Sequence, residues 1–242
     1  MNKLPLTKKQ IIDLFKKQKK LISSSEIIDL QYSEGRILSQ DIKSQINIPP
    51  FNNSAVDGYA LLKKDLNLKK TFICKRRVAA GDNKKIVVKS GEAVRVFTGA
   101  KMPSNSSTVV MQENVRVKGS YITLLKTPQF GENYRIKGED IKKNKMILPI
   151  GTKINHQNLN LIAAAGVRKI KVYKKIKIGF FTSGNELRKP TKKLKNAEIN
   201  NSNYYALNTL LDKKYITKKY LGNLKDNLVT VKKSLIKSSK KF

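Results

Sequence analysis

The chain has 242 residues and a formal net charge of +34, because 51 Lys and Arg residues stand against 17 Asp and Glu residues. Its apolar content of 39% is well above that of a disordered chain, so we expect one large folded domain or two smaller ones. The single cysteine, Cys74, excludes an internal disulfide and is expected to be a small buried strand residue. No stretch approaches the roughly 20 apolar residues of a membrane helix, which predicts a soluble, cytoplasmic protein.

The positive charge does not by itself indicate a nucleic-acid-binding protein. The excess is nearly all lysine and is spread over almost every segment. The sequence has no Arg-Gly repeats, no zinc-finger spacing and no aromatic residues interleaved with a basic stripe. We therefore expect no specific nucleic-acid binding; a basic nucleic-acid binder is an alternative that rests on charge alone. A positive surface also attracts anionic small molecules.

The first part of the chain predicts two helices followed by a β-rich region. Residues 7–22 place apolar side chains at helical spacing behind Thr7, and residues 23–42 are expected to continue as a second amphipathic helix broken near Gly35. From Asn47 to about Lys126 the sequence changes to short β-rich runs. Gly, Asn, Asp and Ser separate these runs, a pattern typical of a compact β-barrel or sandwich.

The second part of the chain predicts the start of an α/β unit. A polar loop over 130–141 precedes a short helix, "NHQNLNLIAAAG", which Gly166 closes. Strands follow within 167–187 and end abruptly in "TSGNE". A helix capped by Asn or Ser at 201–214 and a strand at 215–222 complete the strand–loop–helix–strand pattern of a doubly wound domain.

The sequence lacks the standard catalytic signatures. It has no P-loop, no dinucleotide-binding glycine motif, no His-Glu-x-x-His and no Cys-x-x-Cys. Its only histidine, His156, stands at a helix start as a surface or capping residue, so a Ser-His-Asp triad and a His-ligated metal site are nearly excluded. What remains are side chains in Gly/Ser/Thr/Asn-rich loops: Asp57, Thr98, Asp140 and Glu186.

Each of these loops alone is also what a turn or a helix cap would look like. Four of them in one basic chain indicate a site. Carboxylates are ligands that suit Mg²⁺, and a strand-to-helix loop such as "TSGN" presents backbone N–H groups to an anion.

Ordered motifs through most of the chain resemble one family. "EGRILSQDI", "IPPFNNSAVDGYAL", "GEAVRVFTGAKMPSNSSTVVMQE", "GENYRIKGEDI", "LIAAAGVRKIKVY" and "FFTSGNEL" followed by "EINNSN" are similar to the molybdopterin molybdenumtransferases, the MoeA family, which includes the gephyrin E domain. The resemblance runs from about residue 8 to residue 222.

The resemblance implies a multidomain α+β protein that forms an elongated homodimer. Residues 1–26 would form an N-terminal helix packed on the α/β domain, and 27–46 with 143–175 a discontinuous stalk domain. Residues 47–142 would form an inserted, β-rich, barrel-like domain. Residues 176–242 would start a molybdopterin-binding α/β domain that is incomplete. The active cleft would lie between the inserted domain of one subunit and the α/β domain of the other.

The implied activity is insertion of molybdenum from molybdate into adenylated molybdopterin, with Mg²⁺ and release of AMP. A molybdopterin adenylyltransferase is the implied pathway partner. Arg135 would act as an anion clamp. By the same resemblance Asp57 and Glu186 would contact the metal, and the catalytic residues would be Asp57, Thr98, Asp140 and Glu186. The implied substrate-binding residues are Ser54, Gly99, Arg135, Ser183 and Gly184.

Two departures from the family pattern bear on activity. Asn185 stands where the family usually has an aspartate before the glutamate of "TGDEL", which removes one negative charge. A Gly-Gly-Val-Ser loop with a downstream aspartate, which binds the pterin in the family, does not occur, nor does a C-terminal β domain. The sequence therefore leaves open an alternative: a truncated, inactive member that acts as a dimerisation or scaffold module.

Overall fold

The computed structural model describes residues 6–17, 24–191 and 193–242. These residues form two compact units, each described on its own below. The first unit takes in the described residues of 1–41, 148–160 and 168–242, and the second takes in 42–147 and 161–167. Helices and strands are both present, which confirms the mixed α and β class, whereas the predicted domain limits stay predictions. No helix within the described ranges is long and apolar enough to cross a membrane.

The N-terminal helix is confirmed as α1, Lys8–Lys17. Thr7 caps it, because the Gln10 N–H donates to Thr7 Oγ1 at 3.3 Å and the Gln10 side chain accepts from the Thr7 N–H at 2.8 Å. The end of the predicted helix, 18–22, lies outside the described residues. The packing of this helix on the α/β domain stays a prediction.

The predicted second helix over 23–42 is wrong. The segment forms β1, Ser25–Asp29, then a 3₁₀ turn at Leu30–Tyr32, and later the short strand β2, Ile42–Lys43. β1 pairs antiparallel with β12, Lys169–Tyr173, more than a hundred residues away in sequence. Pairing with this distant strand overrides the local helical pattern.

Arg36 and Gly35, which follow β1, show why the segment cannot be helical. The buried Arg36 donates to Glu26 Oε1 at 2.5 Å and to the Tyr173 carbonyl at 2.8 Å, and these contacts hold the turn against both strands. Gly35 has φ +73°, and a Cβ there would lie 2.7 Å from Cβ of Lys214. The chain therefore reverses at Gly35 instead of continuing a helix.

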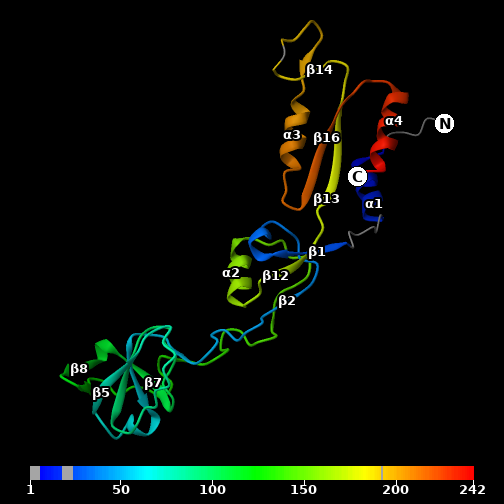
Figure 1. Ribbon diagram of the computed structural model, residues 1–242. Helices are drawn as coiled ribbons and strands as arrows, with labels where there is room; N and C mark the ends of the chain where they lie inside the picture. Colours follow the sequence, from blue (N-terminus) through cyan, green and yellow to red (C-terminus); the bar gives the residue numbers. More distant parts are fainter. Residues whose placement is uncertain (1–5, 18–23, 192) are drawn as a thin grey trace. The chain divides into compact units, whose positions relative to one another are not determined.

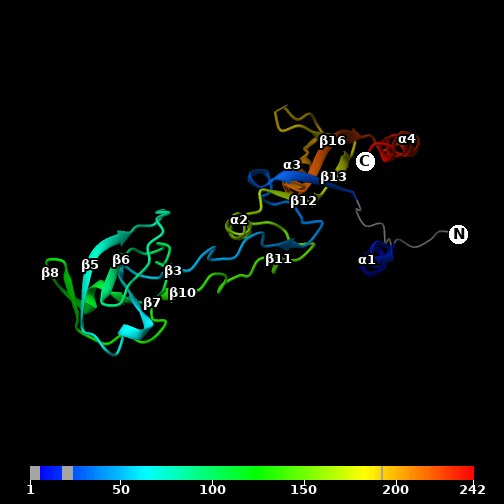
Figure 2. The same ribbon diagram turned by 60° about the horizontal axis from the view of Figure 1, so that its bottom comes forward.

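The second unit is built on a six-stranded sheet with the order β7-β4-β6-β5-β9-β8. Figure 2 shows β5, β6, β7 and β8 in this unit. β5 and β6 are parallel, and the other neighbours are antiparallel. The predicted β-rich runs are confirmed as β4 Gly58–Leu62, β5 Thr71–Val78, β6 Glu92–Val96, β7 Ser106–Met111, β8 Val115–Lys118 and β9 Tyr121–Leu124.

The sheet is covered on both faces at β4, where all five residues are buried. Alternate residues of β4 supply the two cores: Ala60 and Leu62 belong to one apolar cluster, and Tyr59 and Leu61 belong to the other. Short strand pairs complete the unit: β3, Asn53–Ser54, with β10, Tyr134–Arg135, and β2 with β11, Met146–Leu148. Because β4 is covered on both sides, the residues at its start are fixed in position.

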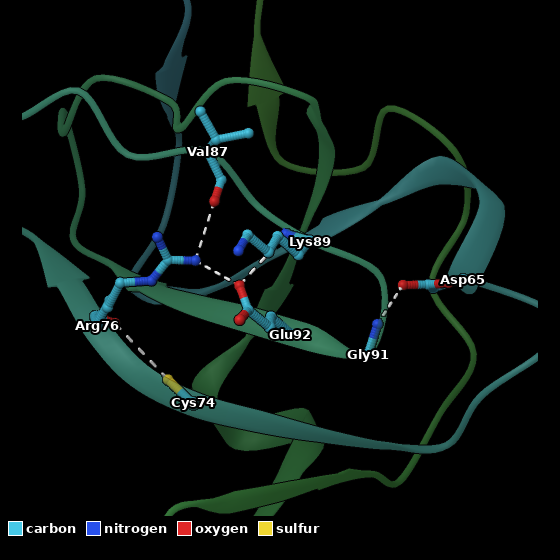
Figure 3. A network of polar contacts seen from close by, with 7 residues as sticks. All are labelled: Asp65, Cys74, Arg76, Val87, Lys89, Gly91 and Glu92. Atoms are coloured by element: carbon cyan, nitrogen blue, oxygen red, sulfur yellow. Dashed lines mark hydrogen bonds and ion pairs between the residues drawn. The ribbon is translucent and has the colours of Figure 1, made fainter.

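Polar contacts anchor the loop that leads into β6 (Figure 3). Arg76 on β5 donates to the Val87 carbonyl at 2.9 Å and pairs with Glu92 at the start of β6. The carboxylate of Asp65, which is 1% exposed, accepts from the Gly91 N–H at 2.8 Å and from the Ser90 hydroxyl at 2.8 Å. These contacts fix where β6 begins, and therefore where it ends.

Cys74 lies on β5 in the same network and is half-buried. Its thiol donates to the Arg76 carbonyl at a sulfur–oxygen distance of 3.8 Å (Figure 3). Burial raises the pKa of the thiol, which disfavours the reactive thiolate. The strand position is confirmed, whereas Cys74 is half-buried and not fully buried as predicted.

The predicted α/β pattern is confirmed in the first unit. β13, Ile176–Ser183, and β16, Ile216–Leu224, are parallel neighbours, and α3, Ser202–Leu210, connects them (Figure 1). The Asn201 side chain caps α3 by accepting from the Tyr204 N–H at 3.1 Å. The short strands β14, Leu187–Arg188, and β15, Ile199–Asn200, precede α3.

Two further helices complete the chain. α2, His156–Ala164, begins at His156, which is exposed, so the prediction of a surface residue at a helix start is confirmed. α4, Leu228–Ser239, occupies the lysine-rich segment to which the sequence assigned no element. Asn227 caps α4 by accepting from the Thr230 N–H at 3.0 Å.

Candidate functional site

The central contact of the candidate site joins Asp57 and Thr98. Asp57 immediately precedes β4, and Thr98 follows β6, which lies beside β4 with Gly58 opposite Val96. The backbone N–H and the hydroxyl of Thr98 both donate to Asp57 Oδ1, each at 2.7 Å. The structure thus brings together two residues that the sequence selected independently, 41 positions apart.

The loop that carries Asp57 is fixed by backbone contacts. The Gly99 N–H donates to the Ser54 carbonyl at 2.9 Å, and the Ser54 N–H donates to the Ala100 carbonyl at 3.0 Å. The Ser54 hydroxyl is buried and donates to the Val56 carbonyl at 2.6 Å. Ser54 therefore holds the loop, and direct substrate contact by Ser54 and Gly99 stays a prediction.

Arg135 and Asp140 form a second group, next to the first. Arg135 on β10 lies opposite Asn53 on β3, so β3 and β10 link the two groups. Arg135 Nε donates to Glu139 Oε1 at 2.5 Å, and Nη2 donates to Asp140 Oδ2 at 2.7 Å. These two carboxylates, Asp140 first, raise the pKa of Arg135. The predicted anion clamp is already occupied by two carboxylates of the same loop.

Two residues near Asp57 were missed at the sequence level. The Gln112 N–H donates to the Asp57 carbonyl at 3.1 Å, and the Gln112 side chain accepts from Arg95 Nη2. The Arg95 guanidinium lies over the ring of Tyr59, 4.8 Å from its centroid, and 5.3 Å from the centroid of Phe97. The sequence feature that could have identified Arg95 is its position on the strand that leads to Thr98.

The pKa of Asp57 is lowered from its ordinary value. The largest causes are the hydrogen bonds from the Thr98 N–H and the Thr98 hydroxyl, and the charge of Arg95 adds to them, whereas desolvation opposes the shift. The Asp57 carboxylate is therefore held in its ionised form by this environment.

Replacing Thr98 with valine removes the hydroxyl bond and keeps the backbone bond. We expect the pKa of Asp57 to rise toward its ordinary value, to be measured by NMR titration of the carboxyl carbon. A carboxyl with a lowered folded-state pKa stabilises the fold above its unfolded-state pKa of about 3.9 and loses that contribution as the pH falls through the folded-state value. The free energy of unfolding in urea should therefore be higher for the wild type than for Thr98→Val at neutral pH, and the difference should shrink in acid.

Thr71→Val is the matched control for that experiment. Thr71 is exposed on β5, and its hydroxyl contacts only the hydroxyl of Thr123 among the described residues. This control should leave the pKa of Asp57 unchanged. An unchanged Asp57 pKa in Thr98→Val as well would contradict the assignment.

The first unit contains the other predicted loop, Ser183 to Glu186. It begins at the last residue of β13, at the carboxyl edge of the parallel pair, where ligands commonly bind in α/β sheets. Gly184 lies against the Glu186 carboxylate, since a Cβ at Gly184 would be 2.7 Å from either carboxylate oxygen. Glu186 is half-buried and Ser183 is exposed.

Asp226, missed at the sequence level, holds this loop from the end of β16. It accepts from the Ser183 hydroxyl at 3.2 Å and from the Asn185 N–H at 3.3 Å, and its own N–H donates to Asn185 Oδ1 at 3.3 Å. An amide at position 185 makes this exchange without placing a second carboxylate beside Asp226. Asp226 could have been identified from the sequence, because it follows the second predicted parallel strand and the ends of two parallel strands meet at one sheet edge.

A cavity of about 240 Å³ lies near the same sheet edge. Beside it the buried Thr182 accepts from the Asn201 amide at 2.8 Å and donates to Asn223 Oδ1 at 3.0 Å. Because Asn201 also caps α3, one side chain joins the helix start to the strand end. The cavity is lined by Lys189, Pro190, Asn201, Tyr204, Tyr205 and Tyr220.

The predicted site residues thus fall into two sets, one in each unit. Among the described residues no three His, Cys, Asp or Glu side chains gather as a metal site. The predicted metal ligands Asp57 and Glu186 belong to different units, and their contact with Mg²⁺ stays a prediction.

Comparison with known proteins gives consistent matches. A family model, the MoeA N-terminal region (domains I and II), matches residues 6–166. The chain is 34% identical to a molybdopterin molybdenumtransferase of Haemophilus influenzae, over 88% of this chain and 53% of the relative. It is 32% identical to one from Nostoc sp., over 88% of this chain and 50% of the relative. The chain therefore spans about half the length of the curated relatives it matches.

A solved structure matches over a similar part of the chain. The crystal structure of the molybdopterin biosynthesis moeA protein from Pyrococcus horikoshii OT3 aligns with a TM-score of 0.83 at 32% identity. The alignment covers 90% of this chain and 60% of that one. Fold and sequence therefore point to the same group of proteins.

Proposed function

The chain belongs to the MoeA family, and on that premise we propose that it acts in molybdenum cofactor biosynthesis. The reaction we assign is insertion of molybdenum from molybdate into adenylated molybdopterin, with release of AMP. The names of the two bacterial relatives support this assignment. Molybdate is a substrate of this reaction.

The observation that carries the proposal is the Asp57–Thr98 contact. Two hydrogen bonds of 2.7 Å to Oδ1 fix the side chain, and Oδ2 has no hydrogen-bond donor among the described residues. A preorganised, ionised carboxylate is the kind of group that positions a reacting partner or accepts a proton from it. Asp57 is therefore assigned the role of base or positioning group in the second unit.

In the first unit we assign substrate contact to the loop Ser183–Glu186. Glu186 lies at the carboxyl edge of a parallel strand pair, and the loop is held in place because the Asn185 N–H donates to Asp226 and the Gly184 N–H donates to the Leu224 carbonyl at 3.1 Å. Both substrates are anions, and the net charge of +34 favours their approach. Because the described carboxylates gather no three-ligand site, no step is assigned to Mg²⁺.

The alternative function is a scaffold module of the same family that pairs with a second copy and does not transfer molybdenum. Its support is that Arg135, the predicted anion clamp, is already paired with Glu139 and Asp140. A homodimer is proposed under either function, and a molybdopterin adenylyltransferase is the proposed donor of the adenylated pterin under the first.

The deciding experiment combines a transfer assay with sedimentation. Purified chain is incubated with adenylated molybdopterin and molybdate, and AMP release is followed together with reconstitution of a molybdenum-dependent apoenzyme. We expect AMP release that requires molybdate and yields active apoenzyme. A chain that forms a dimer by analytical ultracentrifugation but releases no AMP would favour the scaffold function.

A further inference from the structure

Arg95 differs from the other arginines that are at least half-buried. In the part of the chain that the structure describes, four of these five side chains form an ion pair with a carboxylate, and Arg95 forms none. The four paired residues are Arg36, Arg76, Arg135 and Arg188. A half-buried guanidinium without a carboxylate is costly unless another group compensates it, so Arg95 requires an explanation.

Arg95 is held in place by groups that leave its charge uncompensated. It lies opposite Tyr59 in the β4–β6 register, and its guanidinium contacts the faces of the Tyr59 and Phe97 rings. The Gln112 side chain accepts one of its N–H groups. A guanidinium carries five N–H donors, so most of them have no protein acceptor among the described residues. Aromatic faces and one amide orient the cation without neutralising it.

Arg95 also lies beside the Asp57–Thr98 contact. Gln112 connects the two, because its side chain accepts from Arg95 and its N–H donates to the Asp57 carbonyl. The charge of Arg95 reaches the Asp57 carboxylate and helps to lower its pKa, yet the two groups form no ion pair within 4.0 Å. The guanidinium therefore adjoins the site and keeps donors for another ligand.

We propose that Arg95 binds an oxyanion group of the substrate in the second unit, and that Arg135, held by Glu139 and Asp140, does not. The inference rests on the proposed function. A planar guanidinium presents two parallel N–H groups that match two oxygens of a tetrahedral oxyanion. Molybdate and the phosphate of an adenylated pterin share this chemistry, so the experiment must separate them.

The test is titration calorimetry of the whole chain with two probes, inorganic molybdate and AMP. We expect Arg95→Gln to weaken binding of one probe by about tenfold to a hundredfold, since a charge-assisted hydrogen-bonded pair is lost. The probe affected identifies the source of the oxyanion. Arg95→Lys keeps the charge but not the planar fork, so its affinity should be intermediate.

Arg116→Gln is the matched control, because it removes the same charge from an exposed position on β8 of the same sheet. It should bind both probes as the wild type does. Circular dichroism and the melting temperature check that each variant is folded. If Arg95→Gln is not folded, the affinity of Arg95→Lys provides the test.

Three results would overturn the inference. The first is that the wild type binds neither molybdate nor AMP. The second is that Arg95→Gln, or Arg95→Lys if Arg95→Gln does not fold, binds both probes as tightly as the wild type, and the third is that the Arg116→Gln control loses as much affinity as Arg95→Gln. If Arg95→Gln raises the pKa of Asp57 but binding is unchanged, Arg95 serves Asp57 alone. If the chain binds an oxyanion through Arg95 but does not transfer molybdenum, the proposed function is contradicted and the role of Arg95 in oxyanion binding is retained.

Discussion

Replacing Asp57 with asparagine is expected to lower the rate of molybdenum transfer by about a hundredfold or more, as loss of a positioned acid–base or charged group typically does. Asparagine has almost the same shape, and its Oδ1 can still accept both Thr98 bonds that the structure shows at 2.7 Å. The substitution therefore removes the negative charge and one acceptor oxygen but not the local geometry. The measurement is molybdate-dependent AMP release under saturating substrates.

Asp82→Asn is the control for this substitution. Asp82 lies in the same unit, and its carboxylate also accepts a backbone N–H, from Ala79 at 3.0 Å. It has no part in the proposed site, so transfer should be unchanged. Full transfer activity in folded Asp57→Asn would remove Asp57 from the assigned role.

Replacing Gly58 with alanine is expected to destabilise the second unit by about 3 kcal/mol or more, the upper range for overpacking in a core. A Cβ at this position would lie 2.1 Å from the Val110 carbonyl oxygen and 2.8 Å from Val109 Cγ1. The carbonyl belongs to the β4–β7 ladder, in which Val110 pairs with Tyr59, so it cannot withdraw without breaking strand pairing. Urea unfolding of wild type and variant measures the difference.

Gly119→Ala separates this steric effect from backbone strain. Gly119 lies between β8 and β9 with φ +58°, and a Cβ there meets nothing within 4 Å. Its replacement should cost only about 1 kcal/mol, the strain of a left-handed alanine. Equal losses in the two variants would show that contact with Val110 is not the reason for glycine at position 58.

Gly58 also matters for the site, because it adjoins Asp57. The close approach of β4 to β7 sets the position of the strand start, and thus the direction in which Asp57 reaches Thr98. Partial relaxation of Gly58→Ala would move this carboxylate. We therefore expect the variant to lose transfer activity even at temperatures where it remains folded.

Much of the architecture follows from local sequence patterns. Short runs of β-branched and aromatic residues between Gly, Asn and Asp turns predicted the strands of the six-stranded sheet, and the pattern after residue 176 predicted the parallel pair β13 and β16. Asp57 and Thr98 were both selected because each stands in a polar loop beside an apolar strand. Such features depend on neighbouring residues, so a single sequence reveals them.

Contacts between distant segments could not be obtained in this way. β1 has a helical apolar pattern, yet it pairs with β12, and that partner is invisible to local periodicity. The neutralisation of Arg135 by Glu139 and Asp140 required the observed loop geometry, although all three lie within six residues. Loop conformation depends on backbone contacts to β3 that no propensity encodes.

Motifs and local patterns were enough to predict the family, the strand or helix type of most segments, and the loops that carry the candidate site. Which side chains meet became known from the folded chain: Thr98 with Asp57, Asp226 with the Ser183 loop, and Arg95 with two aromatic rings instead of a carboxylate. The two kinds of information differ in how far along the chain they act. Periodicity and turn chemistry act over a few residues, whereas the charge and hydrogen bonding of a site are set by strand pairing across tens of residues.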